Sequence, residues 1–196
     1  MKTEQIERIV NRGLDSLRNS LDVYWPAINE NDMTERNLSI HVAHSFIQSN
    51  WGVYGEASFP KSADKRLDLL ALHEETNTFV AAESKILPDG NRAMGLATDV
   101  ERIKTFKPIT DYFEPKAGFG LFLAATWSEE IKEWWIREED HGSPPEGNMG
   151  AGWEALGKHL DRLGATCRAR WLQDNDETTD KYHTQWALYA IIKLPL

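Results

Sequence analysis

The chain has 196 residues and a formal net charge of −9, because its 31 acidic residues outnumber its 22 basic residues. This length is typical of one domain, so we expect a single domain over 1–196, and the 41% share of hydrophobic residues excludes general disorder. The acidic excess excludes a protein that wraps nucleic acid by bulk electrostatic attraction. The single cysteine excludes a disulfide framework and a cysteine-rich zinc site. No apolar run reaches the roughly 20 residues needed to cross a bilayer, which predicts a cytoplasmic protein that does not bind a membrane.

The first half of the chain changes from helical to extended patterns. Apolar residues at spacings of three and four predict a helix over 1–20, and a second helix begins near Thr34 with Glu35 in its first turn. Three extended runs follow, over 53–59, 66–72 and 79–87. The polar sequence HEETNT between the last two runs predicts a hairpin. Helical spacing then returns over 91–106.

The second half adds strands and helices in alternation. The sequence GFGLFLAATW predicts a buried strand, and Ser128 can cap the helix that follows it. Glycine and proline predict a loop over 141–152, before a helix that ends at Gly164. Two alternating runs at the C-terminus predict an antiparallel pair. This order of elements predicts a mixed β-sheet flanked by helices, a fold of the α/β class at its border with α+β.

Asp68 is the residue that points most directly to chemistry. It lies between Leu67 and Leu69 in a run that otherwise has the composition of a core strand, where an unpaired carboxylate is costly. Glu83 and Lys85 lie in the next run and share one face, because side chains alternate along a strand. The three side chains can therefore meet across the hairpin. Two carboxylates there suit Mg²⁺ or Mn²⁺, which prefer hard oxygen ligands.

An Asp in one strand and Glu-x-Lys in the next, after a helix that carries a Glu, resembles the PD-(D/E)XK nuclease superfamily. The resemblance covers 34–106, and Leu67 stands where the family has its name-giving proline. It implies a single nuclease-like domain with the restriction-endonuclease-like fold. The implied activity is metal-dependent hydrolysis of phosphodiester bonds, by an endonuclease or an exonuclease that acts on DNA more readily than on RNA. The implied cofactor is Mg²⁺ or Mn²⁺.

The resemblance also gives each matching position an expected role. Asp68, Glu83 and the backbone carbonyl of Ser84 would hold the metal ion, and Lys85 would position or activate the attacking water. Glu35 is the best match for the family's helical glutamate, which assists the metal, and Glu56 is its rival. The residues expected to border the substrate are Arg66, Asp99, Arg102 and Lys104.

Other interpretations of the same residues are structural. Asp68 can cap a turn, Glu83 and Lys85 can form an exposed strand pair, and Asp99, Arg102 and Lys104 can belong to an ordinary solvated helix face. The alternative function is a catalytically inactive nuclease-like fold that binds a protein or nucleic acid. A nuclease with this net charge needs a local basic groove, a homodimer or a protein partner to contact DNA.

Overall fold

The computed structural model describes residues 1–23, 35–59, 62–108, 113–137, 140–145, 150–173 and 185–196, and for 59, 62–65 and 173 the backbone alone. The helices of this part of the chain are α1 (Thr3–Leu21), α2 (Glu35–Gln48), α3 (Gly90–Lys104), α4 (Glu129–Trp135) and α5 (Gly150–Arg162). Its strands are β1 (Gly52–Phe59), β2 (Ser62–His73), β3 (Thr78–Ile86), β4 (Ala117–Thr126), β5 (Thr166–Gln173) and β6 (Gln185–Leu194). The order of these elements agrees with the order predicted from the sequence.

The structure tests one of two predicted boundaries, the end of the loop over 141–152, and leaves the other, the start of the second helix, undescribed. Thr34, the expected start of the second helix, lies outside the described residues. The loop predicted over 141–152 is too long, because α5 already begins at Gly150. The glycines that suggested a loop have another role here, since a Cβ on Gly152 would lie 1.8 Å from the backbone oxygen of Gly90 on α3. Glycine therefore allows two helix backbones to approach closely rather than ending regular structure.

The strands form an open six-stranded sheet in the order β1-β2-β3-β4-β6-β5. Four neighbouring pairs are antiparallel and one pair, β3 with β4, is parallel, so the sheet is mixed but mostly antiparallel. The hairpin predicted from HEETNT is confirmed as β2 and β3. Helix α3 connects β3 to β4, which gives the parallel pair the crossover that it needs.

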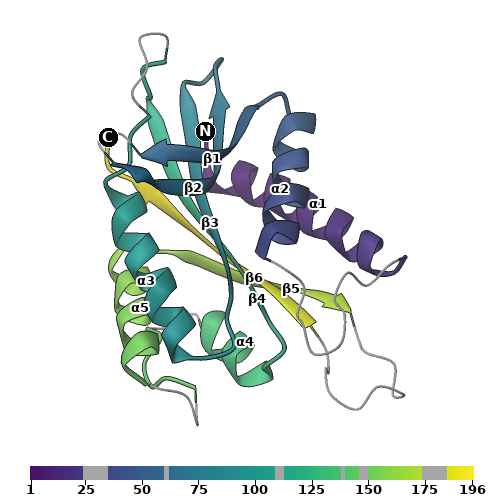
Figure 1. Ribbon diagram of the computed structural model, residues 1–196, viewed down its shortest axis with the longest axis vertical. Helices are drawn as coiled ribbons and strands as arrows, with labels where there is room; N and C mark the ends of the chain where they lie inside the picture. The colour runs from purple at the N-terminus through teal and green to yellow at the C-terminus, as the bar shows by residue number, and fades with distance from the viewer. Residues whose placement is uncertain (24–34, 60–61, 109–112, 138–139, 146–149, 174–184) are drawn as a thin grey trace.

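Helices cover both faces of the sheet, and each face has its own hydrophobic core (Figure 1). On one face, α1 and α2 pack on alternate residues of β3, including Val80 and Ala82. On the other face, α3, α4 and α5 pack on Phe79 and Ala81. Strand β3 is therefore a central strand whose successive side chains enter two different cores. Among the described helices, none is long and apolar enough to span a membrane.

Strand β2 changes face at Asp68. Leu67 packs in the core beneath α3, whereas Leu69 packs in the core beneath α1 and α2, although residues two apart in a regular strand share one face. The pairing with β1 keeps its register there, with Gly55 opposite Leu69 and Ala57 opposite Leu67. Glu56, between these two β1 residues, has a left-handed φ of 54°. The backbone is therefore irregular on both strands around Asp68, as non-glycine residues rarely adopt such a φ.

Candidate functional site

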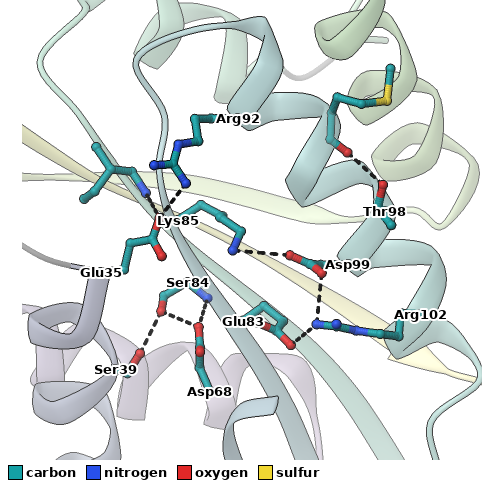
Figure 2. A network of polar contacts seen from close by, with 12 residues as sticks. Glu35, Ser39, Asp68, Glu83, Ser84, Lys85, Arg92, Thr98, Asp99 and Arg102 are labelled. Carbon is teal, nitrogen blue, oxygen red and sulfur yellow. Dashed lines mark hydrogen bonds and ion pairs between the residues drawn. The ribbon is translucent and has the colours of Figure 1, made fainter. Parts of the chain in front are cut away.

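Strand β3 presents consecutive residues to helices on opposite faces of the sheet (Figure 2). Glu83 and Lys85 point towards α3, where they form ion pairs with Arg102 and Asp99. Ser84, between them, points towards α2. The predicted common face of Glu83 and Lys85 agrees with these contacts. The end of β3 therefore brings the Glu-x-Lys pair to α3.

Asp68 is held by β3 through Ser84. Its Oδ2 atom accepts a hydrogen bond from the backbone N–H of Ser84 at 2.8 Å and another from the Ser84 hydroxyl at 2.7 Å. The backbone pairing between β2 and β3 runs from His73 with Thr78 to Leu69 with Ala82, so the Asp68 carboxylate binds the amide just beyond the paired segment. In this structure, the two hydrogen-bond donors of Ser84 offset the desolvation of the Asp68 carboxylate.

Glu83 and Asp99 form a buried ion-pair network with two cations. The Glu83 side chain is 4% exposed and contacts the guanidinium of Arg102. The same Nη2 atom of Arg102 lies 2.9 Å from Oδ1 of Asp99, and Nζ of Lys85 lies 3.7 Å from Oδ2 of Asp99. Asp99 therefore bridges the two cations, one with each oxygen. Buried charges of this kind are stable only when they are paired.

The electrostatic balance of the network favours a further positive charge. Burial, followed by the negative charges of Asp68 and Asp99, raises the pKa of Glu83 to about 8, against the opposing effects of Arg102 and Lys85. Burial also raises the pKa of Asp99, again against the effects of the two cations. Arg102 and Lys85 thus compensate the carboxylates only in part.

Glu35 reaches the same part of β3 from the first turn of α2. Its Oε1 atom accepts a hydrogen bond from the backbone N–H of Ile86 at 3.1 Å and lies 3.8 Å from Nη1 of Arg92. The rival, Glu56, is exposed on β1, across from Asp68 in the strand register. Both glutamates thus lie near the hairpin, and Glu35 is the one that contacts β3.

The four expected substrate-binding residues divide into two groups. Asp99 and Arg102 belong to the network on α3, and because Asp99 is 8% exposed, the interpretation as a solvated helix face is wrong for it. Lys104 pairs with Glu101 at 3.5 Å, and Glu101 also contacts Arg162 on α5, so Lys104 points away from the network. Arg66 is exposed on β2, with Ser58 of β1 as its strand partner.

The interpretation of Glu83 and Lys85 as an exposed strand pair is also wrong. The Glu83 residue as a whole is 3% exposed, and Lys85 pairs with the buried Asp99. Ser39 is not among the residues predicted from the sequence, and its hydroxyl lies 2.8 Å from that of Ser84. Its position four residues after Glu35 places both side chains on one face of α2, which is the signal that could have identified it.

The donor atoms present suit a small divalent cation, although they do not converge on one point in this structure. No group of three or more His, Cys, Asp or Glu side chains in the described part of the chain is arranged to hold a metal ion. Asp68 is engaged by Ser84, and Glu83 by Arg102. Mg²⁺ needs only one or two carboxylates in addition to water and substrate oxygens. Asp68 and Glu83 are two such carboxylates, and each has another partner in this structure.

No protein-family model, no curated protein and no solved structure matches the chain. The functional assignment therefore rests on the Asp/Glu-x-Lys pattern and on the geometry of the residues around β3.

The raised pKa of Glu83 predicts how the stability of the metal-free protein depends on pH. In the unfolded chain this carboxyl loses its proton near its ordinary pKa of 4.5, whereas in the folded protein it loses it at about 8. A carboxyl whose pKa is higher in the folded state destabilises that state as pH rises between the two values, by about 1.4 kcal/mol for each pKa unit. We expect the free energy of unfolding of Glu83→Gln, relative to wild type, to rise by about 2 kcal/mol or more between pH 5 and pH 9, measured by urea denaturation in EDTA.

The matched control for this measurement is Glu114→Gln, which removes an exposed carboxyl. Its free energy of unfolding should stay parallel to that of wild type across the same pH range. Parallel curves for Glu83→Gln and wild type would show that Glu83 ionises as an ordinary carboxyl.

Proposed function

We propose that this protein is a Mg²⁺-dependent nuclease of the PD-(D/E)XK type, which hydrolyses phosphodiester bonds in DNA. The observation that carries the proposal is the group formed at the end of β3, where buried Glu83 and half-buried Lys85 face α3 and Asp68 is bound to the intervening Ser84. The restriction-endonuclease-like fold belongs to the same proposal. It is supported by the succession of α2, the β1–β3 antiparallel strands, α3 and the parallel β4.

Each residue has a definite role in the proposed reaction. Asp68, Glu83 and the carbonyl of Ser84 would hold the metal ion, and Glu35 would assist from α2. When bound, a divalent ion acts as a Lewis acid on the phosphate and lowers the pKa of a coordinated water. The Lys85 ammonium orients the attacking water and offsets the negative charge that develops on the phosphate. Asp99 keeps Lys85 at the site through the 3.7 Å ion pair.

Local basic residues would supply the contacts with DNA phosphates, which the negative net charge of the protein does not favour. Arg92 is 59% exposed at the start of α3, and Arg102 is 23% exposed on the same helix. Both lie on the side of β3 that carries Lys85 (Figure 2). An Arg guanidinium binds phosphate oxygens in a fixed, two-pronged geometry, which suits a nucleic-acid backbone. A homodimer or a protein partner would extend this small basic surface.

A non-catalytic module that binds protein or nucleic acid is the second candidate. The observation that favours it is that Asp68 and Glu83 already have partners, Ser84 and Arg102, in the absence of a metal. A binding module would keep these contacts permanently. The two functions differ in whether a divalent cation binds at Asp68 and Glu83.

Metal binding tests the proposal without a choice of substrate. We expect wild type to bind Mn²⁺ in a calorimetric titration, and Asp68→Asn to bind it at least tenfold more weakly, because the amide keeps an acceptor for Ser84 but lacks the negative charge. The matched control is Asp15→Asn, which removes an exposed carboxylate paired with Arg170 on the opposite side of the sheet from α3. Circular dichroism first establishes that the three proteins fold alike.

Cleavage of plasmid and linear duplex DNA with Mg²⁺ then completes the test. Metal binding that is lost in Asp68→Asn, together with metal-dependent cleavage, is the expected outcome. Binding of nucleic acid with neither metal binding nor cleavage would exclude the nuclease and favour the binding module.

A further inference from the structure

Arg102 holds the position in which a metal ion would compete for Glu83. Its Nη2 atom contacts Oε1 of Glu83 and, at the same time, lies 2.9 Å from Oδ1 of Asp99. Glu83 is nearly inaccessible to water, at 4% exposure, whereas Arg102 is 23% exposed. The guanidinium thus extends from the protein surface to the buried carboxylate (Figure 2). While Arg102 stays in contact with Oε1 of Glu83, its positive charge opposes the approach of a metal ion to that atom, because like charges repel.

The charges of the cluster favour exchange of Arg102 for a divalent ion. Asp68, Glu83 and Asp99 carry three negative charges when ionised, and Lys85 and Arg102 carry two positive charges. The cluster is therefore short of one positive charge. If a divalent ion binds beside Glu83 and Arg102 stays with Asp99, four positive charges face the three carboxylates, so one positive charge is left for an anionic phosphate. A buried cluster gains most from such neutralisation, since little water is present to screen it.

Asp99 provides a second anchor for Arg102. Because Arg102 and Asp99 lie three residues apart on α3, they are neighbours on the helix surface and their ion pair does not depend on Glu83. Arg102 can therefore release Glu83 and stay beside the site. In that position its guanidinium, which carries five N–H donors, can contact a phosphate oxygen in addition to Asp99.

We propose that Arg102 is an exchangeable counterion: it pairs with Glu83 in the metal-free protein, releases Glu83 when a divalent cation binds there, and then binds a phosphate oxygen of the substrate while Asp99 retains it. The proposal rests on the proposed nuclease function. Arg102 thus has two successive partners, Glu83 and then a phosphate oxygen. In the metal-free protein its positive charge opposes the binding of other cations to Glu83. No such exchange is expected for Lys85, which pairs with Asp99 and not with Glu83.

The test is the Mn²⁺ affinity of Arg102→Gln, measured by calorimetry with the metal alone. We expect at least tenfold tighter binding than in wild type, because the competing positive charge is gone, and at least tenfold slower DNA cleavage at saturating Mn²⁺, because a phosphate contact is lost. The matched control is Arg162→Gln, which removes another guanidinium from an ion pair with Glu101 and gives the same change of net charge. Its Mn²⁺ affinity should stay within about twofold of wild type.

The outcomes separate this proposal from the proposed function. Unchanged or weaker Mn²⁺ binding by Arg102→Gln would overturn the exchange alone, provided that wild type binds Mn²⁺ and Asp68→Asn does not. Tighter binding with unchanged cleavage would overturn the phosphate contact. Absence of Mn²⁺ binding in both wild type and Arg102→Gln would overturn the exchange together with the nuclease function.

A second measurement uses the wild-type side chain itself. In protein labelled with ¹⁵N-arginine, one guanidinium resonance, assigned by its absence in Arg102→Lys, should shift when Mg²⁺ is added, because Arg102 changes its partner. An unshifted resonance at saturating Mg²⁺ would contradict the exchange even if Arg102→Gln did not fold.

Discussion

Replacement of Lys85 by methionine should reduce the rate of DNA cleavage by about 100-fold to 1000-fold, the size of effect seen when one group that stabilises developing charge is removed. Methionine keeps most of the side-chain volume and removes the ammonium, which lies 3.7 Å from Asp99. The carboxylates of Asp68 and Glu83 remain, so Mn²⁺ binding should persist in calorimetry. Rates of plasmid cleavage at saturating Mg²⁺ measure the effect.

Lys158→Met is the control for this variant. Lys158 is 78% exposed and pairs with Glu154 at 3.7 Å on α5, so its substitution should leave the cleavage rate within about twofold of wild type. A Lys85→Met protein that folds normally and cleaves DNA at the wild-type rate would refute the role of Lys85. Loss of both cleavage and Mn²⁺ binding would instead show that Lys85 maintains the structure of the site.

Gly152→Ala should produce the largest loss of stability among the changes considered. The added Cβ would lie 1.8 Å from the carbonyl oxygen of Gly90 and 3.0 Å from the backbone nitrogen of Met94, so neither a rotamer change nor a side-chain shift can relieve the clash. Helices α3 and α5 must separate. We expect the free energy of unfolding, from urea denaturation, to fall by about 3 kcal/mol or more.

Gly95→Ala provides the matched comparison on α3. Among the described residues, apart from the chain neighbours and the helix's own backbone, no heavy atom lies within 4 Å of a Cβ at this position. Alanine is also the better helix former, so the free energy of unfolding should rise by about 0.5–1 kcal/mol. Equal effects of the two substitutions would show that α3 and α5 do not pack as closely as described.

The sequence allowed the order of elements to be predicted because each long element has a clear period. In α1, residues at spacings of three and four, such as Ile6, Val10 and Leu14, are all buried. The polar turn between β2 and β3 allowed their hairpin to be predicted equally well. Glycine was harder to interpret, since it marked both a loop and the close packing of α5 on α3. Composition alone does not distinguish these roles, because they depend on what lies opposite the glycine.

The sequence placed several residues of the candidate site on one hairpin and one helix, but it did not predict their contacts. The apolar neighbours of Asp68 suggested a strand buried on both faces, and the two leucines are indeed buried. They are buried in different cores, because β2 changes face between Leu67 and Leu69. No periodicity in a single sequence reports such a change. The ion pair between Glu83 and Arg102 could not be predicted from the sequence either, since it depends on the orientation of α3 against β3.

Two amides of β3 use side chains of other elements as acceptors: the Ser84 N–H binds Asp68, and the Ile86 N–H binds Glu35. Residues 68 and 35 therefore help to complete the backbone hydrogen bonding of the sheet, whether or not a reaction takes place there. A related chain that catalyses no reaction would still need an acceptor at both positions, since an orphaned buried amide costs about 1–3 kcal/mol. Conservation of Asp68 and Glu35 among related chains would therefore say less about catalysis than conservation of Lys85, whose ammonium cannot accept a hydrogen bond from a backbone amide.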